Sequence, residues 1–144
     1  MNAAAVSVRP AVSGDRVDIW PLARDFATTF HLREDAFAAS FDAIIHDDDA
    51  LLIVAERGDG IVGYLLARCH LTFLANGAVG WVEEVMVDES WRRKGVGEAL
   101  MSAAETWSAA KGAAYIALAS RRAKSFYTAM GYDDSATFFR KSLT

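Results

Sequence analysis

Cysteine and long apolar runs are scarce in this sequence, and it carries no excess of basic residues. Cys69 is its single cysteine, so no internal disulfide can form, and a reducing compartment suits the chain. No apolar run approaches the roughly 18 to 20 residues that a membrane-spanning helix needs. Residues 1–15 also lack the basic stretch and apolar segment of a signal peptide. We therefore expect a cytoplasmic protein without a membrane partner.

The charge balance argues against nucleic acid as a partner of the whole domain, because the net charge is −4. Hydrophobic residues make up 53% of the chain and charged residues 24%, which is the balance of an ordinary folded domain. The length of 144 residues is sufficient for a core that needs no disulfide or metal. We predict a single domain over residues 1–144.

Apolar periodicity predicts the element order β-α-α-β-β-β-α-β-α-β. Alternating or continuously apolar runs indicate strands at 6–9, 50–56, 61–74, 79–88, 114–119 and 137–143. Helical spacing and capping residues indicate helices at 15–29, 34–45 and 122–130, and between Gly95 and Gly112. The RGDG sequence at 57–60 predicts a hairpin turn, and the apolar run 114–119 is typical of a central strand covered on both sides. The pattern predicts a mixed sheet with helices on its faces.

Three basic residues followed by two glycines mark a candidate site for a small anion. Arg92, Arg93 and Lys94 stand directly before Gly95 and Gly97, where a strand ends and a helix begins. The first amides of a helix have no partner within it, and glycine lets a ligand approach the backbone without a Cβ in the way. Two bridged phosphates suit this arrangement. The alternative is a solvated turn before an ordinary helix, which is the commoner meaning of a short glycine motif taken alone.

The longer context resembles the Gcn5-related N-acetyltransferase (GNAT) superfamily. The dinucleotide fingerprint does not fit, because position 100 is leucine, and no P-loop sequence is present. The RxxGxG motif at 92–97 follows a predicted strand that ends in VMVD, and the sequence SRRAKSFYTAMGY comes later, at 120–132. The opening of the family resembles VRPAVSGD at 8–15, and its end resembles FFRKSL at 138–143. The resemblance covers nearly the whole chain. It implies the GNAT fold of the α/β (α+β) class, a mixed, mostly antiparallel sheet of about six or seven strands with helices on both faces.

The resemblance also implies acetyl-CoA as the cosubstrate and suggests its contacts. In the family, the RxxGxG motif holds the pyrophosphate, and the backbone at the end of the preceding strand pairs with the pantetheine arm. Carried over position by position, the cofactor-binding residues are Val85, Met86, Val87, Arg92, Arg93, Lys94, Gly95, Val96, Gly97, Glu98 and Ser120. Many members carry asparagine at the position of Ser120, so this chain departs from the pattern at that contact.

Acetyl transfer to an amine needs a base for the amine and an acid for the departing thiolate. The sequence WVEEV at 81–85 supplies Glu83 and Glu84, which point to opposite faces of a regular strand, so only one of them can face the substrate. Resemblance to polyamine-acetylating members predicts Glu83 as the base, with Glu84 as the alternative. Tyr127 matches the tyrosine that protonates the CoA sulfur in many members. The competing interpretations are a surface charge and an ion-pair partner for the glutamates, and a core residue for Tyr127.

The acceptor site is expected beside the first two helices, because the resemblance implies that these helices and their loop close over it. Trp20, Phe30 and Glu83 are predicted to contact the acceptor, whereas Phe37 suits an ordinary core position. Metal-ligand spacing is missing from the three histidines and the single cysteine, so no metal is expected.

Together these residues predict an acetyl-CoA-dependent N-acetyltransferase in which a primary amine attacks the thioester directly within a ternary complex. The alternative is a catalytically silent domain that binds acyl-CoA as a sensor or interaction module. Both functions need Arg92, Gly95 and Gly97, whereas only the enzyme needs Glu83 and Tyr127. The sequence leaves open the identity of the amine, the length of the acyl group and the formation of a homodimer.

Overall fold

The structure is a computed structural model that describes residues 6–58 and 60–144, so Asp59 of the predicted RGDG turn lies outside the described residues. The helices are α1 (Arg16–Phe26), α2 (Glu34–Ile45), α3 (Val96–Ala110) and α4 (Lys124–Ala129), with short 3-10 helices at Ser13–Asp15 and Glu89–Trp91. The strands are β1 (Val6–Pro10), β2 (Ala50–Arg57), β3 (Gly60–Thr72), β4 (Gly77–Val87) and β5 (Ile116–Leu118). In the described ranges, no helix has the length and apolar character to cross a membrane.

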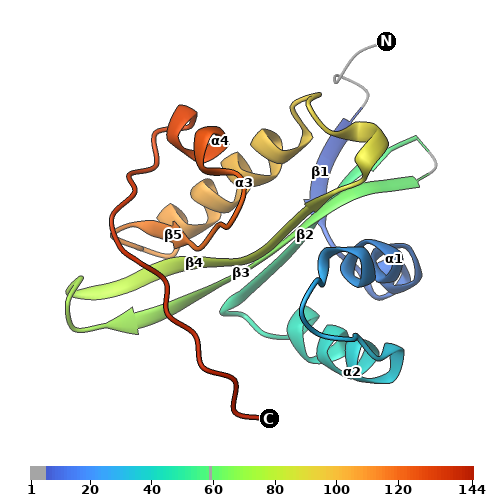
Figure 1. The fold of residues 1–144 in the computed structure, drawn as a ribbon, viewed down its shortest axis with the longest axis horizontal. Coiled ribbons are helices and arrows are strands. Elements are labelled where there is room, and N and C mark those ends of the chain that lie inside the picture. The colour runs from blue at the N-terminus through green and yellow to red at the C-terminus, as the bar shows by residue number, and fades with distance from the viewer. Residues whose placement is uncertain (1–5, 59) are drawn as a thin grey trace.

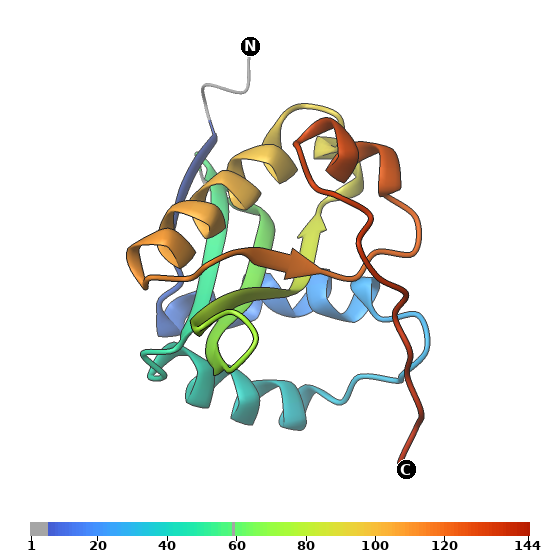
Figure 2. The ribbon, with the colours of Figure 1, turned by 90° about the vertical axis from the view of Figure 1, so that its left-hand side faces the viewer.

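One mixed sheet runs through the middle of the protein, with its strands in the order β1-β2-β3-β4-β5 (Figure 1). Each adjacent pair among β1 to β4 is antiparallel, and β5 is parallel to β4. Helices α3 and α4 lie on one face of the sheet, and α1 and α2 lie on the other (Figures 1 and 2). The predicted fold class, a mostly antiparallel mixed sheet with helices on both faces, is confirmed.

A separate apolar layer fills each face of the sheet. On the α3 side, Leu100 is fully buried against strand residues that include Leu65. On the other side, Ile19 of α1 and Phe41 of α2 pack with Tyr64 of β3. The neighbours Tyr64 and Leu65 point to opposite layers, as the period of two in a strand requires. Full burial of each large apolar side chain contributes about 1.5–3 kcal/mol.

The prediction of a last strand at 137–143 was wrong, and the described sheet has five strands. Residues after α4 run without helix or strand past the β5 side of the sheet toward the layer of α1 and α2 (Figures 1 and 2). Phe139 and Leu143 are 87% and 90% exposed, so the apolar residues of this segment have no sheet face to cover. Consequently β5, three residues long, is an edge strand of the described sheet and not the longer central strand predicted at 114–119.

Arg9 of β1 joins β1, β2 and the start of α1. Its guanidinium donates to the two carboxylate oxygens of Asp15 at 2.8 and 3.0 Å, and it donates to both oxygens of Glu56 at 3.1 Å. The buried carboxylate of Asp15 also accepts the Val12 amide at 2.8 Å. These hydrogen bonds fix the direction in which α1 leaves β1, and hence the wall that α1 forms over the sheet.

The variant Asp15→Ala is expected to lower the free energy of unfolding by about 2 kcal/mol, because the Val12 amide and Arg9 lose a buried acceptor. The hydrogen bonds from Arg9 hold the pKa of Asp15 below its usual value. A carboxylate of this kind stabilises the fold above its unfolded-state pKa, and its contribution is lost as the pH falls through the folded-state pKa. Urea unfolding of both proteins between about pH 7 and pH 2 measures this. An effect that does not shrink with acid would contradict the role of ionised Asp15.

Candidate active site

A β-bulge in β4 decides which glutamate faces α1 and α2. The register of the β3–β4 ladder shifts by one residue after Val82, so Glu83 is the extra residue of the bulge. Val82 and Val85 both pack in the layer on the α3 side, although they are three positions apart and would face opposite ways in a regular strand. Glu84 therefore lies on the other face, toward α1 and α2.

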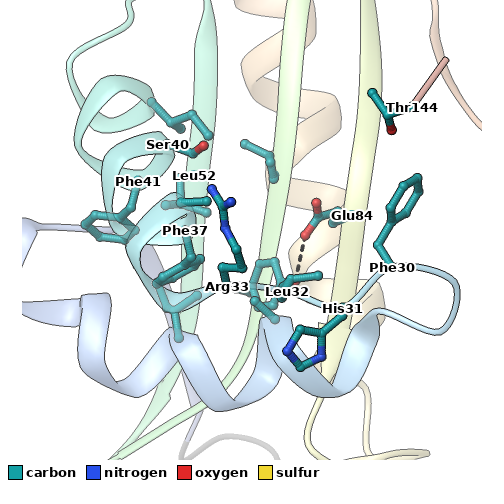
Figure 3. A pocket seen from close by; sticks show the side chains of 16 residues that line it. Phe30, His31, Leu32, Arg33, Phe37, Ser40, Phe41, Leu52, Glu84 and Thr144 are labelled. Carbon is teal, nitrogen blue, oxygen red and sulfur yellow. Dashed lines mark hydrogen bonds between the residues drawn. The ribbon is translucent and has the colours of Figure 1, made fainter.

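A cavity of about 620 Å³ lies on this face, between α1, α2 and the sheet (Figure 3). Its volume is typical of a small-molecule site. Most of its lining is apolar or aromatic, and the residues are Ile19, Ala23, Phe30, His31, Leu32, Arg33, Ala36, Phe37, Ser40, Phe41, Ile44, Leu52, Tyr64, Leu66, Glu84 and Thr144. The described residues contain no group of three or more histidine, cysteine or acidic side chains placed to hold a metal ion.

Glu84 is the one acidic side chain among the described residues of this lining, and Tyr64 holds it in place. The Tyr64 hydroxyl donates a hydrogen bond of 2.7 Å to Glu84 Oε1, drawn as the dashed line in Figure 3. Burial raises the pKa of Glu84; the hydrogen bond from Tyr64 opposes this shift, and the nearby charge of Glu83 adds to it. A carboxylate with a raised pKa in an apolar cavity is suited to accept a proton near neutral pH.

The structure separates the residues that were predicted to contact the acceptor. Phe30 lines the cavity and is 59% exposed, with the Arg140 guanidinium 5.9 Å from the centre of its ring. Trp20 lies outside the lining, and its ring packs 5.3 Å from that of Phe37. Phe37 packs against the core of this layer, as the sequence predicted, and it also lines the cavity. Glu83 is exposed and also lies outside the lining.

Helix α3 begins directly after the basic loop, where the sequence predicted a helix start. Gly95 has a φ of +86°, a left-handed conformation that favours glycine, and it precedes the first helical residue, Val96. The Ala99 amide donates to the Gly95 carbonyl at 3.1 Å, so the amides of Val96, Gly97 and Glu98 point out of the helix end. Apart from Gly95 itself and its neighbours in the chain, no heavy atom of the described residues lies within 4 Å of a Cβ built on Gly95. This helix start is open to an anion.

Gly97 has a second reason to be glycine, which sequence reasoning missed. A Cβ built there would lie 3.4 Å from Cζ of Phe126 and 3.9 Å from Cγ2 of Val87. The ring of Phe126 in α4 therefore packs over the first turn of α3. Because Gly97 lies under this ring at the open helix end, a branched side chain there would disturb the packing as well as the approach of a ligand.

The three basic residues of the loop are exposed, and two of them contact other residues of the chain. Arg92 Nε donates a hydrogen bond of 3.0 Å to the Val87 carbonyl at the end of β4. Lys94 Nζ lies 5.3 Å from the centre of the Trp91 ring. Arg93 has a φ of +62°, which is uncommon for a residue other than glycine. Arg92 thus ties the loop to β4 in addition to placing positive charge there.

Strand β4 is longer than the part of it that pairs with β5. The parallel pairing ends at Val82 and Leu118, so Val85, Met86 and Val87 lie beyond it. Within the described chain, these three residues pair with β3 on one side and have no β5 partner on the other. That open side is where the resemblance places the pantetheine arm, and the contact stays a prediction.

The two remaining predicted residues lie in the segment after β5. Ser120 is exposed, and its hydroxyl accepts a hydrogen bond of 3.1 Å from the Ala123 amide before α4. Tyr127 is half-buried and packs edge-on against Phe126 and Tyr132, with ring centres 4.9 and 5.8 Å away. Burial raises the pKa of Tyr127, so its hydroxyl keeps its proton at neutral pH and can donate it. The roles of Ser120 and Tyr127 toward CoA stay predictions.

Tyr64 is a residue of the cavity that sequence reasoning missed. It is 2% exposed and pairs with Met86 across the β3–β4 ladder, on the same face as Glu84. A tyrosine inside a buried apolar strand needs a partner for its hydroxyl. That requirement was the available signal, because it pointed to an acceptor on a neighbouring strand.

Comparison with known proteins confirms the resemblance to the GNAT superfamily. A family model described as "Acetyltransferase (GNAT) family" matches residues 16–132. One similar structure is a transcriptional regulator from Bacillus halodurans C-125, with a TM-score of 0.87, 23% identity, and coverage of 96% of this chain and 99% of that chain. Another is glucosamine-6-phosphate N-acetyltransferase from Arabidopsis thaliana, with a TM-score of 0.85, 21% identity, and coverage of 96% and 99%. An aminoglycoside N-acetyltransferase in complex with CoA has a TM-score of 0.82, 20% identity, and coverage of 94% of each chain.

No curated protein matches the sequence. The family match extends from α1 to Tyr132 and so includes the bulge in β4, the open start of α3 and Tyr127. The similar structures show the same fold over nearly the whole chain. The chain therefore belongs to the GNAT acetyltransferase family.

Proposed function

We propose that this protein is an acetyl-CoA-dependent N-acetyltransferase that transfers the acetyl group to a primary amine by direct attack in a ternary complex. One observation carries the proposal: a single strand, β4, bears Glu84 in the cavity and ends at the loop that opens α3. In this proposal, the carboxylate for the amine and the anion site for the acyl donor lie close in sequence, on one strand and the loop after it. Such fixed positioning of two reactants contributes strongly to catalysis.

The residues at the start of α3 fit the pyrophosphate of CoA. The amides of the first helical turn point outward, the helix dipole adds positive potential, and the space over Gly95 is open. The exposed side chains of Arg92, Arg93 and Lys94 add positive charge around the same point. When bound, acetyl-CoA supplies an acetyl thioester and a thiolate leaving group.

We assign the role of base to Glu84 and not to Glu83, which the family resemblance favoured. The carboxylate of Glu84 is part of the cavity lining, whereas Glu83 is an exposed residue of the bulge. Glu84 takes a proton from the bound ammonium, and the lone pair of the neutral amine is then free to attack the acetyl carbon. Tyr64 orients the carboxylate through its hydrogen bond of 2.7 Å.

The variant Tyr127→Phe is expected to lower the rate of acetyl transfer by about 10²-fold, the lower end of the range for general acid catalysis. The proposed role of Tyr127 is to give its proton to the departing thiolate as the carbon–sulfur bond breaks. The second proton, which the nitrogen loses as the amide forms, returns to Tyr127 through solvent, so the protons balance. The effect is small for an acid because a thiol has a pKa of about 8.5 and its thiolate leaves with moderate help. Single-turnover rates at saturating acetyl-CoA measure it.

The affinity for CoA is the control for Tyr127→Phe. The phenyl ring keeps the packing against Phe126 and Tyr132, so calorimetry should give nearly the same CoA affinity for the variant and the wild type. A variant rate equal to the wild-type rate across about pH 6 to 9 would make Tyr127 a packing residue only.

A thiol-release assay over a panel of primary amines tests the proposed function, with calorimetric titration of CoA in parallel. We expect CoA to bind and at least one amine to release free thiol in proportion to the acetylated product. Binding of CoA without thiol release from any amine would overturn the enzyme proposal and favour an acyl-CoA sensor.

A further inference from the structure

We propose that the cavity beside Glu84 selects primary amines that carry one positive charge on an apolar or aromatic body. The inference rests on the proposed function, because it names the acceptor class of the same site. The cavity is expected to disfavour polycationic amines and amino sugars that carry a phosphate.

The charge of the cavity matches one ammonium group. Glu84 is the one acidic side chain among the described residues of the lining, and one of its oxygens already accepts the hydrogen bond from Tyr64. A second ammonium on the same ligand would find no further acidic side chain in the described lining, most of which is apolar or aromatic. An unpaired charge is strongly unfavourable there, so a ligand with several positive charges is disfavoured.

The walls of the cavity match an apolar body. Figure 3 shows Phe37, Phe41 and Leu52 gathered on the α2 side, with Glu84 on the other side of the cavity. The rings of Phe37 and Phe41 pack together with their centres 5.9 Å apart. An amine whose ammonium binds Glu84 can therefore extend its carbon chain or ring along this apolar wall and remove it from water.

The cationic side chain in the lining does not form a phosphate site. Arg33 is 71% exposed at its side chain, and its Nε already lies 3.4 Å from Oδ1 of Asp35. An ion pair between Arg33 and a phosphate would be exposed in the same way. Solvent would screen it, so it would add little energy to phosphate binding. The first turn of α2 carries Glu34 and Asp35, and their charges repel a phosphate from the amides of that helix start.

A series of n-alkylamines from propylamine to heptylamine tests the apolar body directly. Each methylene that is fully removed from water contributes about fourfold, so kcat/KM for acetyl transfer should rise by about fourfold per methylene until the cavity is filled. Spermidine and glucosamine 6-phosphate should be at least about tenfold poorer substrates than hexylamine and 2-phenylethylamine. A flat series, or a preference for spermidine or the amino sugar phosphate, would overturn the inference.

The variant Ser40→Asp tests the charge. Ser40 is an exposed residue of α2 that lines the cavity, so aspartate there adds a second carboxylate. The ratio of kcat/KM for α,ω-diamines to kcat/KM for n-alkylamines should rise by about fivefold. Ala39→Asp is the matched control, because it adds the same charge at the neighbouring exposed position outside the lining. An equal rise in both variants would indicate general attraction at the surface and contradict selection by the cavity.

Binding without turnover separates this inference from the proposed function. Hexylamine and spermidine are titrated calorimetrically into the wild type and Glu84→Gln. If no amine releases thiol, but hexylamine binds at least about tenfold more tightly than spermidine and needs Glu84, the proposed function fails and the selectivity stands. If hexylamine does not bind, or if polycations are the best substrates, the selectivity fails whatever the outcome for acetyl transfer.

Discussion

Replacing Gly97 with valine is expected to lower the affinity for acetyl-CoA by about 10³-fold. The proposed pyrophosphate accepts hydrogen bonds from the first amides of α3, and each bond to a charged group contributes about 1.5–3 kcal/mol, so the loss of two such bonds gives a change of this size. We expect the branched side chain to narrow the approach of the pyrophosphate to those amides. It would also press on Phe126, whose Cζ lies 3.4 Å from the Cβ position. Calorimetric titration of CoA measures the loss.

The variant Gly97→Ala separates ligand approach from helix packing. The Cβ of alanine would lie 3.4 Å from Cζ of Phe126, which is ordinary van der Waals contact. Alanine in a helix is favoured over glycine by up to about 1 kcal/mol. This variant should therefore fold at least as well as the wild type. Reduced CoA affinity in this stable variant would show that the ligand needs the space. An unchanged affinity in folded Gly97→Val would remove the pyrophosphate from this helix start.

The start of α3 could be predicted from the sequence because its signals are local. Gly95 stands between a basic loop and an amphipathic run, and the structure gives it the left-handed conformation that such a glycine allows. Val96 begins the helix and is buried in the core. All of these features lie within a few neighbouring residues, so they need no knowledge of the rest of the fold.

The face to which each glutamate points could not be predicted, because it depends on a distant strand. In a regular strand Val82 and Glu84 share one face, and nothing in the sequence of residues 79–88 indicates that they lie on opposite faces. The bulge at Glu83 arises from the register with β3, and it moves Glu84 to the cavity while Val82 stays in the layer on the α3 side. Register is a property of the paired strands, which explains why sequence reasoning left both glutamates as candidates.

The prediction of a strand in the last segment was wrong for a related reason. Residues 137–143 contain Phe138 and Phe139, which raise strand propensity, but a strand forms only beside a partner with a free edge and a face to cover. In the described chain these two side chains are 54% and 87% exposed, and the segment has no ladder with β5. Strand propensity is a weak predictor where tertiary contacts do not support it.

Replacing Glu84 with glutamine is expected to lower kcat for the best amine by about 10³-fold at neutral pH, within the range for loss of a general base. Because burial raises the pKa of Glu84, the low-pH limb of the wild-type rate profile should lie above the ordinary glutamate value of about 4.3. The variant should lose this limb and keep its affinity for CoA. If Glu83→Gln behaves in this way and Glu84→Gln does not, the exposed residue of the bulge is the base.

The same substitution should leave the protein at least as stable as the wild type, because the raised pKa of Glu84 means that its ionisation opposes folding. A carboxyl group with a raised folded-state pKa binds its proton more tightly in the folded chain, so stability falls as the pH rises from the unfolded value of about 4.3 through the folded value. Glutamine carries no charge and can still accept the hydrogen bond from Tyr64. At about pH 7 the thermal midpoint of Glu84→Gln should equal or exceed that of the wild type, and the difference should shrink toward about pH 4. A variant that loses activity and stability together would indicate that Glu84 supports the fold and does not accept the proton.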